Sequence, residues 1–452
     1  MIPQNRDCVT PRVLVTDGGQ RSALAATRSL GRAGFQVIVG ETTKRCLAAV
    51  SRYCAGSVTY PSPYDDETRF LEALLEGVAR ERIDVIVPTT DLTSAILSAH
   101  KHRFEPRTTV AVVDSNRFWA ASDKIQLHHL AESLNVPTPT LHFVEEPVRA
   151  HDLGAALSYP CVLKPSRSRL RHQGRWIAAS VRHIASPEQF AATIRDRIEF
   201  QHPYMVQRRI QGDGYGVFAL CRDGEPLVLF AHHRLREKPP SGGVSVLRES
   251  VALDPAIADL ASRLLRALHW HGVAMVEFKR EAATGRYYLM EVNGRLWGSL
   301  QLAIDAGVDF PVLLVRLYTG GVLEPVQGYR CGVRSRWILG DVDHFLGRLA
   351  GPRSRADGLA PLGRFLWDFF WPYQPNTRPE VERWSDMRPA LLEINTYVRS
   401  ILSSLRERIR PGSCPRARQE SGDGTDDHLH RAVDHPHRGR RRVREDQRDG
   451  PD

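Results

Sequence analysis

The stretches 273-VAMVEFK-279 and 287-YYLMEVNGR-295 decide the fold of this chain. Both are rich in residues that favour extended structure, so both predict β-strands. Gly285, between them, can supply the left-handed residue of a three-residue hairpin loop over 283–285. Such a loop places Glu277 directly opposite Glu291, and Asn293 then points to the same face of the sheet.

This acidic hairpin predicts a metal site. Two carboxylates and an amide oxygen on one face form an oxygen-only site, which suits Mg²⁺ (or Mn²⁺) better than zinc. Like charges this close repel each other unless a cation or a proton lies between them. The alternative is a solvated hairpin with scattered acids, because a one-residue slip in register separates Glu277 from Glu291.

The composition is that of a globular protein with several domains. The chain has 452 residues, of which 42% are hydrophobic and 25% charged, and this length predicts about three domains. A net charge of +10 favours anionic partners such as nucleotide phosphates, acidic metabolites, nucleic acid or a membrane surface. An arginine-rich surface without such a partner is the alternative, and charge alone does not separate these options.

The cysteine pattern and the lack of a recognisable targeting or membrane segment predict a cytoplasmic protein. The seven cysteines include no CxxC pair, so neither a zinc ribbon nor a disulfide framework is expected, and a reducing compartment fits best. The N-terminus does not have the pattern of a secretory signal. No apolar run is long enough to span a membrane. The aromatic run 365–371 (FLWDFFW) is too short, and a buried helix face is favoured over a surface anchor.

The order of predicted elements divides the chain into four parts. Strands over 12–16 and 35–39 flank a helix over 22–32, and a similar unit follows, which predicts an open α/β domain over 1–115. The fingerprint GxGxxG is absent, so a nicotinamide cofactor is weakly supported. A second domain is expected over 116–325 and a mainly helical region over 326–410. The tail over 411–452 pairs nine arginines with nine acids and has few apolar residues, so it is expected to be disordered.

In chain order, these features resemble the ATP-grasp superfamily, in particular its carbamoyl-phosphate-synthase-like and carboxylate–amine ligase branches. The resemblance is carried above all by Glu277 with Glu291-x-Asn293-x-Arg295, which is similar to the metal-binding signature of that superfamily. It implies an α/β fold of the α+β ATP-grasp kind. An N-terminal open Rossmann-like domain would be followed by a two-lobed ATP-grasp module, the helical region and the tail.

The resemblance also implies roles for cationic residues. Lys124 and Lys164 are similar to the two lysines that contact the triphosphate, where each would act as a point charge. The forked guanidinium of Arg295 suits a carboxylate or the transferred phosphoryl group. Arg295 and Lys164 are the expected catalytic residues, and ATP and Mg²⁺ (or Mn²⁺) the expected cofactors. Solvated surface charges are the alternative for either lysine taken alone.

The chain departs from the family pattern around the nucleoside. The segment that contains Gln207, Arg208 and Ile210 is similar to the hinge of the family but lacks the glutamate that usually holds the nucleoside. These three residues are therefore expected to contact the nucleoside, and Asp213 is expected to replace the missing acid. The loop after Lys164 carries arginines in place of a glycine-rich flap. A second basic segment over 234–245 is expected to be a mobile loop near the substrate, with a plain surface loop as the alternative.

These observations predict a ligase that uses Mg²⁺-ATP to activate a carboxylate as an acylphosphate and couples it to an amine or similar nucleophile. A non-catalytic nucleotide-binding or regulatory protein is the alternative, because the usual ribose-binding acids are missing. A basic nucleic-acid-binding protein comes third and rests on charge alone, so a nucleic-acid partner is not expected. The expected partners are small-molecule carboxylates and amines, and a homodimer is left open.

Overall fold

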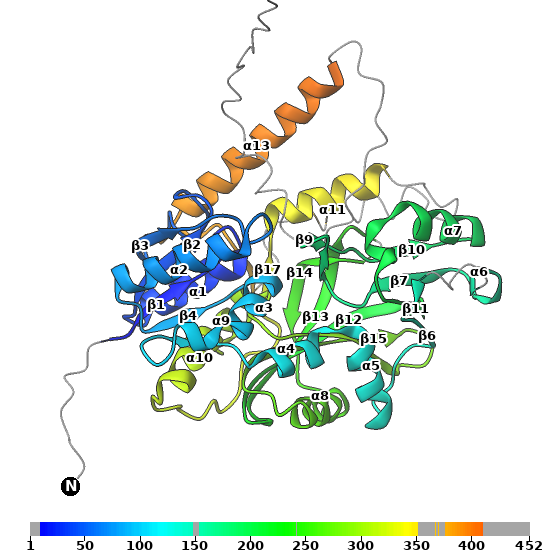
Figure 1. The fold of residues 1–452 in the computed structure, drawn as a ribbon, viewed down its shortest axis with the longest axis horizontal. Helices are drawn as coiled ribbons and strands as arrows, with labels where there is room; N and C mark the ends of the chain where they lie inside the picture. The colour runs from blue at the N-terminus through cyan, green and yellow to red at the C-terminus, as the bar shows by residue number, and fades with distance from the viewer. Residues whose placement is uncertain are drawn as a thin grey trace, which may run out of the picture.

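The structure is a computed structural model that describes residues 10–147, 153–240, 242–350, 367, 369 and 376–409. Within these residues, strands form sheets of five, seven, four and two members, and helices surround them (Figure 1). The predicted α/β fold class is confirmed.

The N-terminal sheet is parallel, with the strand order β3-β2-β1-β4-β5. Its alternation of strands and helices follows the predicted pattern, although β3 was not among the predicted strands. Its elements are β1 (Arg12–Val15), α1 (Arg21–Arg32), β2 (Gln36–Glu41), β3 (Cys54–Thr59), α2 (Glu67–Glu81), β4 (Val85–Val87), α3 (Asp91–Ala99), the 3₁₀ turn Lys101–Arg103 and β5 (Thr109–Val110).

The second region builds an antiparallel sheet with the order β10-β7-β11-β6 and a separate hairpin of β8 and β9. Two helices lead into it from the N-terminal sheet. The elements are α4 (Ser115–Ser122), α5 (Lys124–Ser133), β6 (Leu141–Val144), α6 (Leu153–Ala156), β7 (Cys161–Pro165), β8 (Arg169–His172), β9 (Arg175–Ala178), β10 (Arg182–Ile184), α7 (Pro187–Asp196), the 3₁₀ turn Ile198–Gln201 and β11 (Tyr204–Arg208).

The largest sheet has the order β16-β15-β12-β13-β14-β17-β18, and the region beyond 326 adds its last two strands. Sequence analysis predicted a mainly helical region there and named no strands. The elements are β12 (Gly212–Arg222), β13 (Glu225–Lys238), β14 (Val244–Ser250), α8 (Pro255–Ala267), β15 (Gly272–Glu281), β16 (Tyr287–Asn293), α9 (Leu300–Ala306), α10 (Phe310–Thr319), β17 (Arg334–Arg336), α11 (Ile338–Ala350), β18 (Thr377–Pro379) and α13 (Arg388–Ile409).

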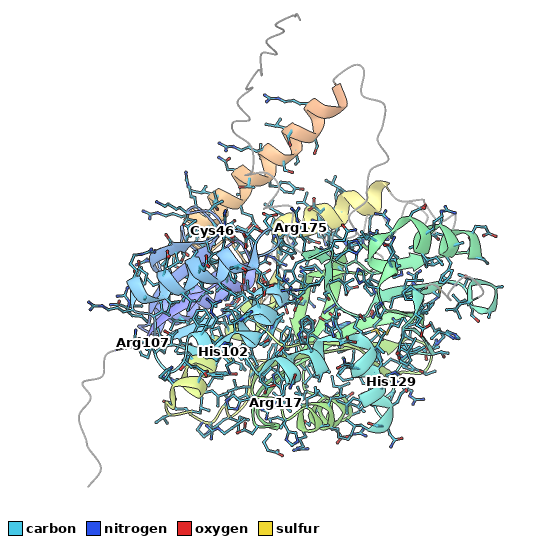
Figure 2. All side chains as sticks on the ribbon, in the orientation of Figure 1. Cys46, His102, Arg107, Arg117, His129 and Arg175 are labelled. Atoms are coloured by element: carbon cyan, nitrogen blue, oxygen red, sulfur yellow. The ribbon has the colours of Figure 1, made fainter. Side chains whose placement is uncertain are left out.

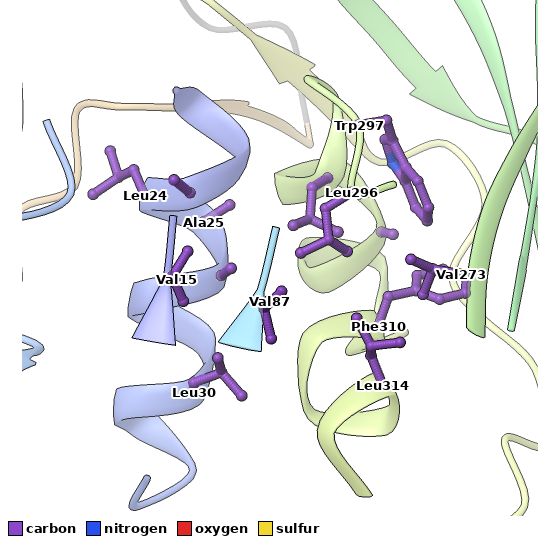
Figure 3. Close-up of a cluster of buried hydrophobic side chains, with 14 of the residues drawn as sticks. Val15, Leu24, Ala25, Leu30, Val87, Val273, Leu296, Trp297, Phe310 and Leu314 are labelled. Atoms are coloured by element: carbon purple, nitrogen blue, oxygen red, sulfur yellow. The ribbon is translucent and has the colours of Figure 1, made fainter. Parts of the chain in front are cut away.

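One hydrophobic core joins the N-terminal sheet to the largest sheet. Figure 3 shows Val15 and Val87, from β1 and β4, between helix α1 and the segment that carries Phe310 and Leu314. Val273 at the start of β15 belongs to the same buried cluster. Because this packing is continuous, the carboxyl ends of β1 and β4 are held in a defined position relative to the acidic hairpin.

Buried ion pairs tie the segment after 376 to both of these sheets. Glu380 accepts from Arg21 Nη1 of α1 at 2.6 Å and also pairs with Arg248 of β14. Asp386 pairs with Arg28 of α1 at 2.8 Å. All five side chains are at most 2% exposed. Because these charges are buried, each guanidinium needs its carboxylate partner to offset the free-energy cost of removing the charge from water.

Some sequence predictions fall outside the described residues. These are the tail over 411–452 and most of the aromatic run 365–371, of which only Trp367 and Phe369 are described. Trp367 is 61% exposed, and Phe369 stacks on Phe345 with ring centroids 4.8 Å apart. None of the described helices is both long and apolar enough to cross a membrane.

Deletion of everything after Arg410 is expected to leave the thermal unfolding midpoint and nucleotide binding unchanged. The deleted part has few apolar residues and is therefore expected to add little to the core, whereas α13 ends before it at Ile409. Differential scanning calorimetry of the truncated chain tests this expectation. A chain that ends at residue 375 is the control, and it should be destabilised because it lacks Glu380 and Asp386. Lost solubility or nucleotide binding in the shorter truncation would make the tail a functional element.

Candidate active site

The acidic hairpin brings the two predicted carboxylates together. Strands β15 and β16 pair antiparallel, and Glu277 lies directly opposite Glu291. The turn is longer than predicted, since β15 ends at Glu281 and β16 begins at Tyr287. Gly285 has the expected left-handed backbone, with φ of +70°. A register shift between Glu277 and Phe278 compensates for the longer turn, so the predicted pair forms through a bulge that was not predicted.

Asn293 completes this set on the same face. Its Nδ2 donates to Glu277 Oε1 and to Glu291 Oε1, each at 3.1 Å. The three side chains therefore converge on one point. Among the described residues, no group of three or more His, Cys, Asp or Glu is placed to hold a metal ion. A cation at this point would take two carboxylates and one amide oxygen from the protein and its other ligands from water or phosphate.

Cationic side chains hold the two carboxylates. Arg234 Nη2 lies 2.5 Å from Glu277 Oε2, and Lys124 Nζ lies 3.9 Å from Glu291 Oε2. Burial raises the pKa of Glu277 above its ordinary value, and the negative charge of Glu291 adds to this effect against the pull of Arg234. Burial also acts on Glu291, but Lys124 and Lys164 outweigh it and lower the pKa of that carboxyl. A bound divalent cation would contact Glu291, whose negative charge the two lysines stabilise, and Glu277, which pairs with Arg234.

Lys124 and Lys164 reach the site from separate elements. Lys124 begins helix α5, its backbone N–H donates to Ser166 O at 2.7 Å, and its Nζ donates to Ser168 Oγ at 3.1 Å. Lys164 lies on β7 and is 8% exposed, with its Nζ 3.9 Å from Met290 Sδ. Burial lowers the pKa of Lys164 to about 8, while Glu291 opposes this shift. A bound polyphosphate would favour the charged form of Lys164.

Arg295 is held by a residue that sequence analysis missed. Asp91, the first residue of α3, accepts two hydrogen bonds from Arg295, at 2.7 Å from Nε and 3.1 Å from Nη2. This bidentate pair fixes the plane of the guanidinium. Asp91 lies in the segment that leads from the end of β4 at Val87 into α3, and the carboxyl ends of parallel strands are where α/β sheets bind ligands. That position was the available signal for Asp91.

The predicted nucleoside contacts fall into two groups. Gln207 is 4% exposed, its Nε2 lies 3.9 Å from Met290 Sδ, and its Oε1 has no hydrogen-bond partner among the described residues. Ile210 is buried. Arg208 is exposed and pairs with Glu281 at 2.7 Å. The side chain of Asp213 is 69% exposed and lies 3.3 Å from His233 Nε2. Gln207 therefore lies near Lys164, around the shared Met290 sulfur, whereas Asp213 faces solvent.

His128 also borders this region and was not predicted. It is fully buried on α5, and burial together with Lys164 and Lys124 lowers its pKa to about 3. The imidazole is therefore neutral at physiological pH. A neutral ring beside two buried lysines adds no charge to the site and leaves their charges for an anionic ligand.

The segment over 234–245 is not the predicted mobile loop. Strand β13 extends to Lys238 and β14 begins at Val244, so most of the segment belongs to the sheet. Arg236 and Lys238 donate to Asp341 and Asp343 of α11, at 2.6 and 2.5 Å. These contacts anchor the basic side chains to a neighbouring helix, and Asp341 also pairs with Arg336 at 2.7 Å.

The glycine turn after β1 already holds an anion from the protein itself. Glu41 Oε2 accepts from the Gly19 N–H at 2.8 Å, just before helix α1. Glu41 is 4% exposed. A carboxylate at this position satisfies the backbone donor that a dinucleotide phosphate would use, which agrees with the absence of the GxGxxG fingerprint.

The part of the chain that contains the acidic hairpin matches a known protein family. Residues 199–339 match the family described as "ATP-grasp in the biosynthetic pathway with Ter operon", and this span contains Arg234, Glu277, Glu291, Asn293 and Arg295. The chain is a member of the ATP-grasp superfamily.

The ATP-grasp chain is similar to several known proteins. It is 23% identical over 279 residues to the carbamoyl phosphate synthase large chain of Methanobrevibacter smithii, which covers 57% of this chain and 25% of that relative. The chain thus spans about a quarter of the length of the curated relatives it matches.

Two solved structures share the ATP-grasp fold. Biotin carboxylase from Campylobacter jejuni has a TM-score of 0.56 and 16% identity, with 73% of this chain and 75% of that chain covered. The L-amino acid ligase from Bacillus licheniformis has a TM-score of 0.54 and 15% identity, with 69% and 75% covered. At this identity, the likeness concerns the fold.

Proposed function

We propose that this ATP-grasp protein is a ligase that uses Mg²⁺-ATP to activate a carboxylate as an acylphosphate and then transfers the acyl group to an amine. The observation that carries the proposal is the convergence of Glu277, Glu291 and Asn293 on one face, beside Lys124 and Lys164. Paired carboxylates of this kind suit a divalent cation held against phosphates.

The residues present fit Mg²⁺ and ATP. Glu277, Glu291 and the amide oxygen of Asn293 would hold the metal after rotation of the Asn293 side chain, and bound Mg²⁺ would neutralise charge on the phosphates. The Oε1 of buried Gln207, which has no hydrogen-bond partner within the described part of the chain, could accept a hydrogen bond from the exocyclic amine of adenine. Lys124 and Lys164 would hold the triphosphate between these two ends.

The proposed chemistry needs no nucleophile from the protein. A carboxylate oxygen of the substrate attacks the γ-phosphorus, the bond from that phosphorus to its bridging oxygen breaks, and ADP leaves. The amine nitrogen then attacks the acyl carbon, the bond to phosphate breaks, and the amine loses a proton to solvent. The protein orients the reactants and stabilises charge. Arg295, fixed by Asp91, would face the transferred phosphoryl group.

Phosphate release from Mg²⁺-ATP is the test of this proposal. A panel of carboxylates, each with and without amines, should contain at least one pair that raises phosphate release well above the background without substrate. Binding of ATP with no phosphate release for any pair would favour a non-catalytic nucleotide-binding protein, which the exposed Arg208 and Asp213 leave open.

Mg²⁺-ATP is expected to raise the thermal unfolding midpoint of the full chain. A ligand that binds only the native state stabilises it by about 2.7 kcal/mol at one hundred times its dissociation constant. Thermal denaturation with and without millimolar Mg²⁺-ATP measures the effect, and Mg²⁺ alone is the control. An unchanged midpoint in folded protein would count against the proposed use of ATP.

A further inference from the structure

The last helix of the described chain carries a stripe of exposed apolar side chains. Helix α13 projects from the body of the molecule in both whole-molecule views (Figure 1 and Figure 2). Five of its apolar side chains recur at spacings of three and four residues, which places them on one face of the helix. They are between 42% and 63% exposed: Leu391, Ile394, Val398, Ile401 and Leu402. A contiguous apolar face that is open to solvent marks a contact surface.

Another side of α13 is bound to the rest of the protein. Glu393 is 3% exposed and accepts from Trp337 Nε1, just before α11, at 2.9 Å. The hydroxyl of Tyr397 donates to Asp343 Oδ1 of α11 at 2.6 Å. These two contacts fix the rotation of the helix about its axis, so the apolar stripe is held on the outward side.

A row of arginines runs beside the stripe. Arg388, Arg399 and Arg406 are exposed, and their separations are close to whole numbers of helical turns, so they share one side of α13. Arg399 follows Val398 directly and therefore lies about 100° from it around the helix. Cations along the edge of an apolar stripe are complementary to a surface that is apolar inside and negatively charged at its boundary, as a bilayer of anionic lipids is.

Two further features favour a bilayer surface. Trp384, shortly before α13, is 95% exposed, and tryptophan is enriched at the boundary between lipid and water. The tail beyond residue 410 pairs nine arginines with nine acids, so the net charge of +10 belongs to residues 1–410. A chain with this excess of positive charge is attracted to anionic lipid.

A second copy of α13 fits the stripe less well than a bilayer does. A coiled coil is indicated by a narrow apolar seam that is sustained over at least three heptads. The exposed stripe begins at Leu391, and even with Leu405, the next apolar residue of the repeat, it spans about two heptads. Leu402 beside Ile401 also makes it wider than such a seam. A bilayer accepts a short, wide stripe because no matching groove is needed.

We propose that α13 binds the surface of a membrane that contains anionic phospholipids. The helix lies in the plane of the surface, with the apolar stripe among the upper parts of the acyl chains and the arginines at the head groups. This interaction does not depend on the proposed ligase activity, so the two proposals are tested separately. Because attraction to the head groups supplies part of the binding, added salt weakens it.

Co-sedimentation of the full chain with lipid vesicles tests the proposal. The protein should sediment with vesicles of phosphatidylcholine and phosphatidylglycerol, bind less to phosphatidylcholine alone, and be released by high salt. Val398→Asp places a charge at the centre of the stripe and should lower partitioning about tenfold or more. Val322→Asp is the matched control, since Val322 is 80% exposed between α10 and β17.

The arginine row is tested with a charge-removing pair. Arg399→Gln should lower partitioning to the anionic vesicles about fivefold and leave binding to neutral vesicles unchanged. Arg107→Gln is its control, because Arg107 is exposed and lies well apart from α13 (Figure 2). The thermal unfolding midpoints of all four variants should match that of the wild type, since each substituted side chain is exposed.

Three results would overturn the proposal. The first is folded wild-type protein that stays in the supernatant with anionic vesicles. The second is an equal loss of binding in Val398→Asp and Val322→Asp, or in Arg399→Gln and Arg107→Gln, because the contact would then lie elsewhere. The third concerns light scattering without vesicles, where wild type and Val398→Asp should have the same molar mass. A dimer that Val398→Asp dissociates would assign the stripe to a second copy of the chain.

Discussion

Glu291→Gln is expected to slow phosphate release from Mg²⁺-ATP by about a thousandfold or more and to leave the protein folded. The substitution is nearly isosteric, so packing changes little. It removes one negative charge from the site proposed to hold a divalent cation against a triphosphate. Positioning of the reacting groups can supply roughly 7–11 kcal/mol of catalysis, so a misplaced γ-phosphate has a large effect. Phosphate release with the productive carboxylate–amine pair is the measurement.

Glu225→Gln provides the control for this experiment. Glu225 is 66% exposed on β13 and pairs with Arg266 on the surface, so its substitution removes the same charge far from the proposed metal. It should retain wild-type turnover. The unfolding midpoints of both variants should stay close to that of the wild type. Near-wild-type phosphate release by Glu291→Gln would show that Glu291 is not a metal ligand.

Glu380→Gln is expected to lower the free energy of unfolding by about 3–5 kcal/mol, the usual cost of breaking a buried ion pair by removing one partner. Glu380 is the shared carboxylate of Arg21 and Arg248, and the three side chains are at most 2% exposed. Its loss leaves two buried guanidinium groups in a region that water does not reach. Chemical denaturation measures the effect. Glu225→Gln again serves for comparison, because exposed ion pairs contribute about 0–1 kcal/mol.

The effect of Glu380→Gln should also depend on pH. Burial alone would raise the pKa of Glu380, but Arg21 and Arg248 outweigh burial and hold the pKa below its ordinary value of 4.5. The ionised carboxylate therefore contributes its full stabilisation above that value and loses it as the pH falls through the depressed folded-state pKa. The difference between wild type and variant should be constant near neutral pH and shrink in acid. A difference that does not change in acid would contradict this account.

The acidic hairpin shows how far sequence reasoning reached in this protein. Strand-forming residues on both sides of Gly285 were sufficient to predict that Glu277 lies opposite Glu291, because side chains alternate along paired strands. The turn length was not predictable, and a bulge near Met290 restores the register that the longer turn would have shifted. The role of this pair as metal ligands stays a prediction.

Contacts between distant segments could not be predicted. Asp91 and Arg295 are 204 residues apart in the chain, and nothing in either local sequence indicates that they pair. Arg234 was assigned to a mobile loop, yet it lies on β13 and holds Glu277. Charge on a surface loop and charge in an active site look alike in sequence, since only burial and the partner distinguish them.

By itself, the sequence determined the α/β class and the acidic hairpin, because strand alternation and local turn chemistry act over a few residues. The two lysines were predicted only from the resemblance to ATP-grasp proteins. The tertiary structure decided which cations neutralise the carboxylates and how the segment after 376 is bound to the rest of the protein through Glu380 and Asp386. These features depend on packing between sheets that are hundreds of residues apart in the chain. Burial then turns their charges into strong and specific interactions.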